Sequence, residues 1–299
     1  MDRAQGSFTV DFSPKGGPAD LRGVLDADGQ TISWADGNSW RRDAEPSFGA
    51  GWAVDAKGAS RLKYLSQAEA ADIDAELMAA PGFGVASLME LSGIAVAAAV
   101  VEMYPPSRYP AVVGVIGPGG NGGDGMVACR HLASMGYSSV VAYYPKRSKG
   151  ALYEGLIASA EMMGVEMVDT LPAPRDDAVV LDAVFGFSFK PPLRAPFGEL
   201  LQAMGQHSNI VAVDVPSGWD VDRGPPADAT DTTDTDAALR PDVLVSLMAP
   251  KRCAKAYRGS AHFLGNVALP PKIALEHGLK RPAFHGTQQV LRLPNPRAC

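Results

Sequence analysis

The stretch AVVGVIGPGGNGGDG, residues 111–125, decides the fold of this chain. A run of apolar, mostly β-branched residues leads directly into a glycine-rich segment. Glycine lets the backbone turn sharply and bring its amides close to an anion at the start of a following helix. Gly117, Gly119 and Gly122 also satisfy the pattern GxGxxG, which is weak evidence by itself. The stretch predicts a strand, a tight turn and a helix, with a phosphorylated, nucleotide-type small molecule at the turn; a turn without a ligand is the alternative.

The chain after this turn alternates short apolar runs with helical stretches. We expect strands at 111–116, 139–144, 165–168, 178–184, 209–215 and 242–249, and helices at 123–135, 150–163 and 197–207. Apolar runs without polar alternation are typical of strands that are covered on both faces. The pattern predicts an α/β fold, a Rossmann-like doubly wound, mostly parallel sheet with helices on both faces.

Two helices are expected before the sheet. Ser66 and Glu69 have the spacing of a capping box, which predicts a helix through Met78. Ser87 and Glu90 repeat that spacing at the start of an apolar segment, and predict a second helix.

Composition and charge argue against several classes of protein. The apolar segment 88–103 carries two glutamates and is shorter than the about 20 apolar residues of a membrane span, so we expect a buried helix and no membrane. The net charge of −6 argues against nucleic acid as the main partner, because phosphate binding needs an excess of Lys and Arg. Cys129, Cys253 and Cys299 lie far apart, which indicates free or buried thiols in a reducing compartment. Since no secretory signal is visible, we expect a cytoplasmic protein, with a mitochondrial one as the alternative.

The first 60 residues differ from the rest. They are rich in Gly and Asp, and TISWADGNSWRR (31–42) contains the hairpin-type turn signal Asp36-Gly37. We divide the chain into an N-terminal extension of unknown role, 1–60, and a main domain, 61–299. The extension is either a small β unit or partly disordered, because its apolar content is low. The acidic, threonine-rich run 225–238 is expected to be a solvated loop.

The glycine turn lacks a feature of ordinary dinucleotide dehydrogenases. In those enzymes an acidic residue about 20 positions further on holds the ribose, whereas this chain has YYPKR at 143–147. Asp124, in the first turn of the predicted helix, would repel a phosphate placed there, or it could cap the helix itself.

Acidic residues end two of the predicted strands. Asp182 ends VVLD and Asp214 ends IVAVD, and open α/β sheets build their sites at the carboxyl ends of strands. We expect Asp214 to be exposed and to serve proton transfer rather than packing, so that Asp214→Ala leaves the fold intact. Lys190, in the loop GFSFK (186–190), could present an ammonium to a phosphate, donate a proton, or be a solvated surface lysine. Asn121, Asp182 and Ser217 offer oxygen atoms that suit a hard cation.

Several motifs, taken in order, resemble a known family. They run from residue 64 to residue 293 and are YLSQAEAADID, LMELSGIA, NGGDG, CRHL, YYPKR, LDAVFGFSFK, DVPSGWD, LMAPK and VLRL. The chain resembles the NAD(P)H-hydrate epimerases, the family of YjeF N-terminal domains that includes the apolipoprotein A-I-binding protein. The resemblance implies an isomerase that interconverts the R and S forms of hydrated NADH and NADPH, NAD(P)HX, in nicotinamide nucleotide repair.

The resemblance also implies site residues and a cofactor. A potassium ion is bound in the family at positions that match Asn121, Asp182 and Ser217. The family's substrate contacts match Gly120, Asn121, Gly122, Gly123, Asp124, Gly186, Phe187, Ser188, Phe189, Lys190, Pro191, Pro192 and Asp214. The chain departs from the family where Gly120-Asn121 replaces Asn-Asn and where Pro191-Pro192 replaces the Gly-Asp that often follows the loop lysine.

The implied chemistry requires proton transfer in both directions. The hydrated ring has a hydroxyl on a carbon bonded to nitrogen. Its loss as water gives a conjugated iminium, and addition of water to the other face inverts the centre. We predict Asp214 as the catalytic proton shuttle, with Lys190 as the second catalytic candidate, either to donate a proton or to orient the substrate.

Two other function classes are alternatives. The same fold serves as a non-catalytic binding scaffold in mRNA-decapping proteins. Since fold does not determine function, a binding scaffold is the first alternative. A NAD(P) dehydrogenase is disfavoured by the missing ribose acid. The combination of NGGDG, Asp182, Lys190, Asp214 and Ser217 favours the epimerase. The hydrate dehydratase that acts on the product is expected to be a separate protein, and a homodimer is left open.

Overall fold

The computed structural model describes residues 7–10, 21–25, 31–35, 39–41, 62–226, 238–280 and 282–294. The chain divides into two compact units, Met1–Trp52 and Ala53–Cys299. The role of the extension stays a prediction. The turn signal Asp36-Gly37, Cys299 and most of the run 225–238 lie outside the described residues.

The first unit contains a small antiparallel sheet. Its strands are β1 (Ser7–Val10), β2 (Leu21–Leu25), β3 (Thr31–Trp34) and β4 (Ser39–Arg41), in the order β1-β2-β3-β4. β3 pairs with β4 through Ser33 and Ser39, which confirms the predicted hairpin. Of the two expectations for this segment, the structure therefore favours the small β unit.

The second unit is built on an eight-stranded sheet. Its strands are β5 (Ala111–Ile116), β6 (Ser139–Tyr143), β7 (Glu166–Val168), β8 (Ala178–Ala183), β9 (Ile210–Val213), β10 (Val243–Leu247), β11 (Ala261–Gly265) and β12 (Val290–Leu293). The order is β12-β11-β10-β9-β8-β5-β6-β7, and every pair is parallel except β11 with β12. The strand order changes direction between β5 and β8, where a doubly wound sheet opens its ligand crevice. The predicted fold class is confirmed.

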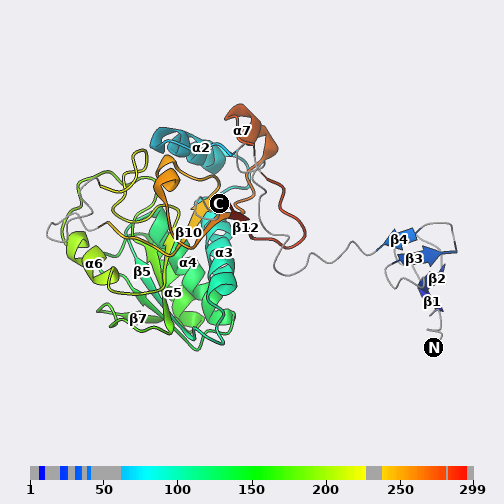
Figure 1. The fold of residues 1–299 in the computed structure, drawn as a ribbon, viewed down its shortest axis with the longest axis horizontal. Helices are drawn as coiled ribbons and strands as arrows, with labels where there is room; N and C mark the ends of the chain where they lie inside the picture. Colours follow the sequence, from blue (N-terminus) through cyan, green and yellow to red (C-terminus); the bar gives the residue numbers. More distant parts are fainter. Residues whose placement is uncertain are drawn as a thin grey trace. The chain divides into compact units, whose positions relative to one another are not determined.

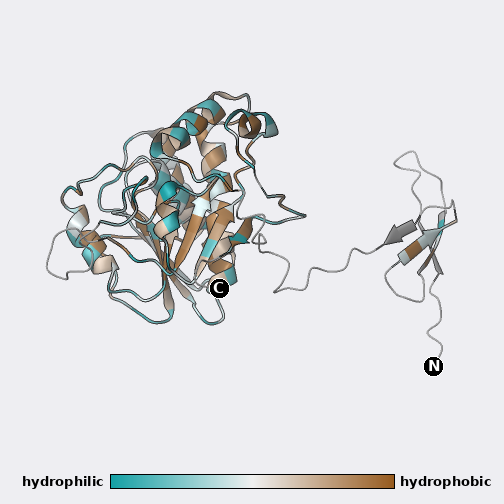
Figure 2. Cartoon of the chain, turned by 45° about the horizontal axis from the view of Figure 1, so that its top comes forward, coloured by the Kyte–Doolittle hydropathy of each residue, from teal (hydrophilic) through white to brown (hydrophobic). Residues whose placement is uncertain are grey.

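Helices cover both faces of this sheet (Figure 1). They are α2 (Gln67–Ala79), α3 (Val85–Met103), α4 (Gly120–Ser134), α5 (Ala151–Met162), α6 (Phe197–Met204) and α7 (Pro271–Glu276), with a 3-10 helix at Arg252–Ala256. Neighbouring residues of one strand pack into different hydrophobic clusters, one on each face of the sheet. Val112 packs with α3 and α4, and Val113 packs with Leu201 of α6. This two-sided burial explains why the strands read as unbroken apolar runs, and the central strands are mostly hydrophobic in Figure 2.

The two helices before the sheet begin differently from one another. The capping box of α2 is present: Ser66 N donates to Glu69 Oε2 at 2.8 Å, and Glu69 N donates to Ser66 Oγ at 3.2 Å. The second predicted box is wrong, because α3 begins at Val85 after Gly84 with no side-chain cap. Glu90 instead forms an ion pair with Arg130 of α4.

Helix α3 is long and apolar enough by composition to cross a membrane, but half of its apolar window is buried within the domain. It packs closely on α4, since a Cβ at Gly93 would lie 2.4 Å from the Val127 side chain. The prediction of a buried helix is confirmed.

Candidate active site

The glycine turn joins β5 to α4 through very close backbone contacts. A Cβ at Gly117 would lie 1.9 Å from the Val184 carbonyl oxygen, and one at Gly122 would lie 1.9 Å from the Gly117 carbonyl oxygen. Gly119 has a φ of +106°, a conformation that side chains rarely adopt. The helix begins at Gly120, three residues earlier than predicted. Glycines are poor helix formers, so the sequence placed the start of the helix too late, whereas close packing against the strands requires them here.

A pocket of about 330 Å³ opens beside this turn, at the carboxyl ends of the strands. Seven of the predicted substrate residues line it: Gly120, Asn121, Asp124, Gly186, Phe187, Ser188 and Asp214. The other six do not. Gly122 and Gly123 are buried in α4, Phe189 stacks on Phe185 with ring centroids 4.7 Å apart, and Lys190, Pro191 and Pro192 are exposed.

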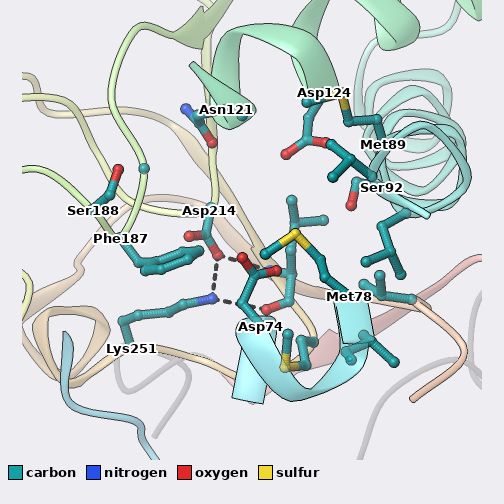
Figure 3. A pocket seen from close by; sticks show the side chains of 18 of the residues that line it. Asp74, Met78, Met89, Ser92, Asn121, Asp124, Phe187, Ser188, Asp214 and Lys251 are labelled. Atoms are coloured by element: carbon teal, nitrogen blue, oxygen red, sulfur yellow. Dashed lines mark hydrogen bonds and ion pairs between the residues drawn. The ribbon is translucent and has the colours of Figure 1, made fainter. Parts of the chain in front are cut away.

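Asp214 lies in the pocket wall together with a lysine that the sequence did not single out (Figure 3). Asp214 is 3% exposed and Lys251 is 2% exposed. The Lys251 ammonium donates to Asp214 Oδ1, and to the Leu247 carbonyl oxygen at 2.9 Å. Leu247 N also donates to Asp214 Oδ1, at 3.2 Å. The expectation that Asp214 is exposed is wrong. Its loss would leave a buried ammonium without its partner, so we now expect Asp214→Ala to destabilise the fold.

The backbone and an aromatic ring hold this pair in place. Asp214 has a φ of +67°, an uncommon conformation for a residue with a side chain, which surrounding contacts must maintain. Its N–H donates to the Val245 carbonyl oxygen at 2.8 Å. The Lys251 ammonium also lies 5.6 Å from the centroid of the Phe187 ring, in the predicted substrate loop. The pair therefore connects the ends of β9 and β10 to that loop.

Two further carboxylates face the same pocket. Asp74 comes from α2, and burial raises its pKa, partly opposed by the positive charge of Lys251. Asp124 comes from α4. Burial raises the pKa of Asp124 well above its usual value, and the negative charges of Asp214 and Asp74 raise it further, while Lys251 and a hydrogen bond with Ser92 lower it. Asp124 makes no cap hydrogen bond with α4, so the capping alternative is wrong.

The predicted cation ligands form a buried polar cluster. Asp182 is fully buried and accepts from Ser217 N at 2.8 Å and from Ser217 Oγ at 2.5 Å. Burial raises the pKa of Asp182 to about 6, although these hydrogen bonds favour its ionised form. Asn121 lines the pocket, and its Nδ2 is buried without a hydrogen-bond partner among the described residues. Asp182 and Ser217 are thus brought together, while no hydrogen bond joins either of them to Asn121 in the described part of the chain.

The fold and the pocket define an α/β protein with a small-molecule site at the carboxyl edge of its sheet. Residues 85–253, more than half of the chain, match the family model described as YjeF-related protein N-terminus. The chain belongs to that family. It is 41% identical over 237 residues to an NAD(P)H-hydrate epimerase of Anopheles gambiae, covering 78% of this chain and 100% of the relative. It is 43% identical over 238 residues to an NAD(P)H-hydrate epimerase of Puccinia graminis f. sp. tritici, covering 78% and 95%.

A plant protein and a solved structure complete the comparison. The pyridoxine/pyridoxamine 5'-phosphate oxidase 1 of Arabidopsis thaliana is 42% identical over an alignment of 253 residues that covers 80% of this chain and 46% of that protein. This chain therefore spans less than half of the plant protein. The crystal structure of the yeast protein ynu0 superposes with a TM-score of 0.70 at 37% identity, covering 78% of this chain and 100% of the yeast chain. The family resemblance that the motifs carry is confirmed.

Sequence reasoning missed two charged residues of the pocket, Asp74 and Lys251. Both lie within motifs that carry the resemblance, YLSQAEAADID and LMAPK, but neither was given a role. The signal that could have found Lys251 is its position just after an apolar strand, at the edge where Asp182 and Asp214 also end their strands.

Proposed function

We propose that this protein is an NAD(P)H-hydrate epimerase that interconverts the R and S forms of NAD(P)HX. One observation carries the proposal: Asp214, paired with Lys251, lines a pocket beside the glycine turn of a YjeF N-terminal domain. Relatives that bear this name match almost over their full length. No observation on the described residues favours the non-catalytic scaffold.

The pocket suits a ring with polar substituents. Its volume of about 330 Å³ lies at the lower end of the range for ligand pockets, so it would take the hydrated ring while the rest of the dinucleotide extends outside. Met78, Met89 and Phe187 contribute an apolar wall. The partnerless Asn121 Nδ2 supplies a donor for an oxygen atom of the ligand, because a buried N–H without an acceptor is unfavourable.

Proton transfer is assigned to Asp214. The carboxylate faces the pocket and accepts a hydrogen bond from the Lys251 ammonium, and a carboxylate within hydrogen-bond reach can take a proton from water. Lys190 is exposed and does not line the pocket, so the catalytic role considered for it is not part of the proposal.

The test is to incubate purified protein with one epimer and follow the appearance of the other by chromatography. Wild type should speed the exchange well above the buffer rate. Asp214→Asn keeps the shape of the side chain and should slow the exchange about 10²–10⁴-fold. Asp177→Asn is a matched control, because the Asp177 side chain is 47% exposed, lies outside the pocket lining and forms an ion pair only with Arg175 among the described residues. Exchange at the buffer rate with folded wild type would rule out the epimerase.

We also propose that Asn121, Asp182 and Ser217 hold a potassium ion. One carboxylate with neutral oxygens is a low-charge ligand set, which suits a weakly held monovalent cation better than Mg²⁺. The side-chain oxygen of Asn121 and the buried Asp182–Ser217 pair are oxygen ligands of the kind that fit such an ion. The ion would supply order to the glycine turn rather than a chemical step.

This proposal predicts a stabilising effect of potassium. An ion that binds only the native state raises stability by mass action, so replacing potassium by tetramethylammonium at constant ionic strength should lower the thermal midpoint and the exchange rate. Asp182→Asn should remove the difference between the two salts. Equal midpoints and rates of wild type in both salts would contradict the cation site.

A further inference from the structure

We propose that Asp124 is a second proton-transfer residue of this site and serves the ring face opposite the one that Asp214 serves. The proposal rests on the proposed epimerase function. In that reaction the hydroxyl leaves one face of a ring carbon and water adds to the other face. A proton must reach or leave an oxygen on each face, and a carboxylate can transfer a proton only to an atom within hydrogen-bond reach.

Asp214 cannot serve both faces by moving. Its Oδ1 accepts from the Lys251 ammonium and from Leu247 N, and its backbone is held by the hydrogen bond to the Val245 carbonyl oxygen. All of these partners belong to β10 or to the segment just after it. A buried side chain with this many fixed partners presents its free oxygen from one direction.

Asp124 reaches the same pocket from a different wall. It lies in α4, and its hydrogen-bond partner Ser92 lies in α3. Figure 3 shows the Asp124 carboxylate beside Ser92 and Met89, and the Asp214–Lys251 pair beside Phe187, at separate places around the cavity. Asp124 and Asp214, two of the three carboxylates of the pocket, thus come from two different sets of elements.

The two carboxylates have different electrostatic surroundings. Asp214 is in contact with the Lys251 ammonium, whereas no basic side chain of the described residues lies within ion-pair distance of Asp124. The groups that face Asp124 are Ser92, Asp74, Asp214, Lys251 and the Tyr153 hydroxyl. Burial and two neighbouring negative charges favour its protonated form. An acid and a base set apart by their surroundings are the usual arrangement for proton transfer in both directions.

The step balances without another reactant. The Asp124 carboxyl gives its proton to the ring hydroxyl, the C–O bond breaks, water leaves, and the nitrogen lone pair forms the C=N bond of the iminium. A water on the other face then adds its oxygen to the same carbon, and the Asp214 carboxylate takes its proton. Asp124 regains a proton from solvent and Asp214 returns one. The opposite epimer reacts by the reverse sequence.

Asp74 is the third carboxylate of the pocket. The charges of Lys251 and Asp214 act on it, and its own charge acts on Asp124, so it is coupled to both proton-transfer groups. Asp74 is therefore unsuitable as a control, and Asp177→Asn is used instead, because Asp177 pairs with Arg175 and does not line the pocket.

The experiment measures oxygen exchange separately from inversion. Each pure epimer is incubated with enzyme in water enriched in oxygen-18, and both label uptake and conversion are followed by mass spectrometry and chromatography. Asp124→Asn should slow interconversion at least about 100-fold. It should still exchange the hydroxyl oxygen of one epimer without inversion, because Asp214 still serves that face. Asp214→Asn should show the mirror-image pattern, and the control Asp177→Asn should exchange and interconvert both epimers as wild type does.

Two results would overturn the inference. If Asp124→Asn folds with the wild-type thermal midpoint and exchanges both epimers equally, or neither, Asp124 does not serve a single face. Should that variant fail to fold, Asp124→Ser replaces it with a smaller polar side chain and the same criterion applies. A failure of the proposed function looks different, because wild type itself would then neither interconvert the epimers nor exchange their oxygen.

Discussion

Replacing Lys251 by methionine is the most direct test of how the pocket wall is held. Lys251 and Asp214 are 2% and 3% exposed, and the ammonium donates to both Asp214 and the Leu247 carbonyl oxygen. Methionine keeps most of the apolar stem and removes the charge. The Asp214 carboxylate would stay buried without its cation, and removing one partner of a buried pair costs about 3–5 kcal/mol.

Urea unfolding followed by circular dichroism measures the loss of unfolding free energy, and a thermal scan measures the change in midpoint. For a domain of about 150–250 residues, 1 kcal/mol corresponds to about 2–4 °C, so the thermal midpoint of Lys251→Met should fall by about 6–20 °C. The double variant Lys251→Met/Asp214→Asn removes both charges and should recover at least about 1 kcal/mol relative to the sum of the two single changes. The pair would then be coupled through its charges rather than through packing alone.

The reasoning is refuted if Lys251→Met unfolds within about 0.5 kcal/mol of wild type, or if the free-energy changes of the single variants simply add. Either result would mean that water or another group already solvates Asp214, and that the two side chains do not form a buried ion pair in solution.

Three further predictions concern the rest of the domain. Gly122→Ala should prevent or severely weaken folding, because its Cβ would lie 1.9 Å from the Gly117 carbonyl oxygen, whereas Gly120→Ala has nothing within 4 Å and should fold normally in the same urea titration. His262 is buried against Ser246 Oγ at 2.9 Å, and burial lowers its pKa to about 3, so the unfolded chain binds the extra proton below about pH 6.5. The free energy of unfolding should therefore fall between pH 6.5 and pH 3 by up to about 1.4 kcal/mol per pH unit. Urea unfolding at pH 7 and at pH 5 measures this fall, which should be smaller in His262→Gln than in wild type. An equal fall in both proteins would mean that His262 is not held neutral. A chain that begins at residue 61 keeps the α2 capping box and should remain folded and active, while aggregation on removal of 1–60 would show that the extension covers the core.

The parallel sheet was predictable because its strands are buried on both faces. Val112 and Val113 point to different cores, which leaves no polar position in β5 and makes the strand visible as an apolar run. The strands β11 and β12 were missed, since AHFLG contains a histidine and VLRL an arginine, and neither is a long apolar run. His262 is accommodated only by its contact with Ser246 on the neighbouring strand, which no local pattern shows.

The sequence predicted where the candidate site lies but not how deeply its residues are buried. The rule that open sheets bind ligands at strand ends placed Asp214 at the correct edge, and the structure puts it in the pocket wall. The rule says nothing about burial, and the exposure expected for Asp214 was wrong. Asp74 and Lys251 were missed for a related reason: they come from α2 and from the segment after β10, and only tertiary packing brings them together.

The pocket places one ammonium among three carboxylates, Asp74, Asp124 and Asp214. A single ammonium can form a close ion pair with one of them, and Lys251 forms it with Asp214. Burial and the neighbouring negative charges oppose ionisation of the other two carboxylates, and neither forms an ion pair with Lys251 among the described residues. An iminium intermediate is positively charged, so its formation between these groups lowers the repulsion as the proton leaves Asp124. The carboxylates of the pocket thus favour protonated Asp124 before the reaction. Once the iminium has formed, its positive charge stabilises the Asp124 carboxylate.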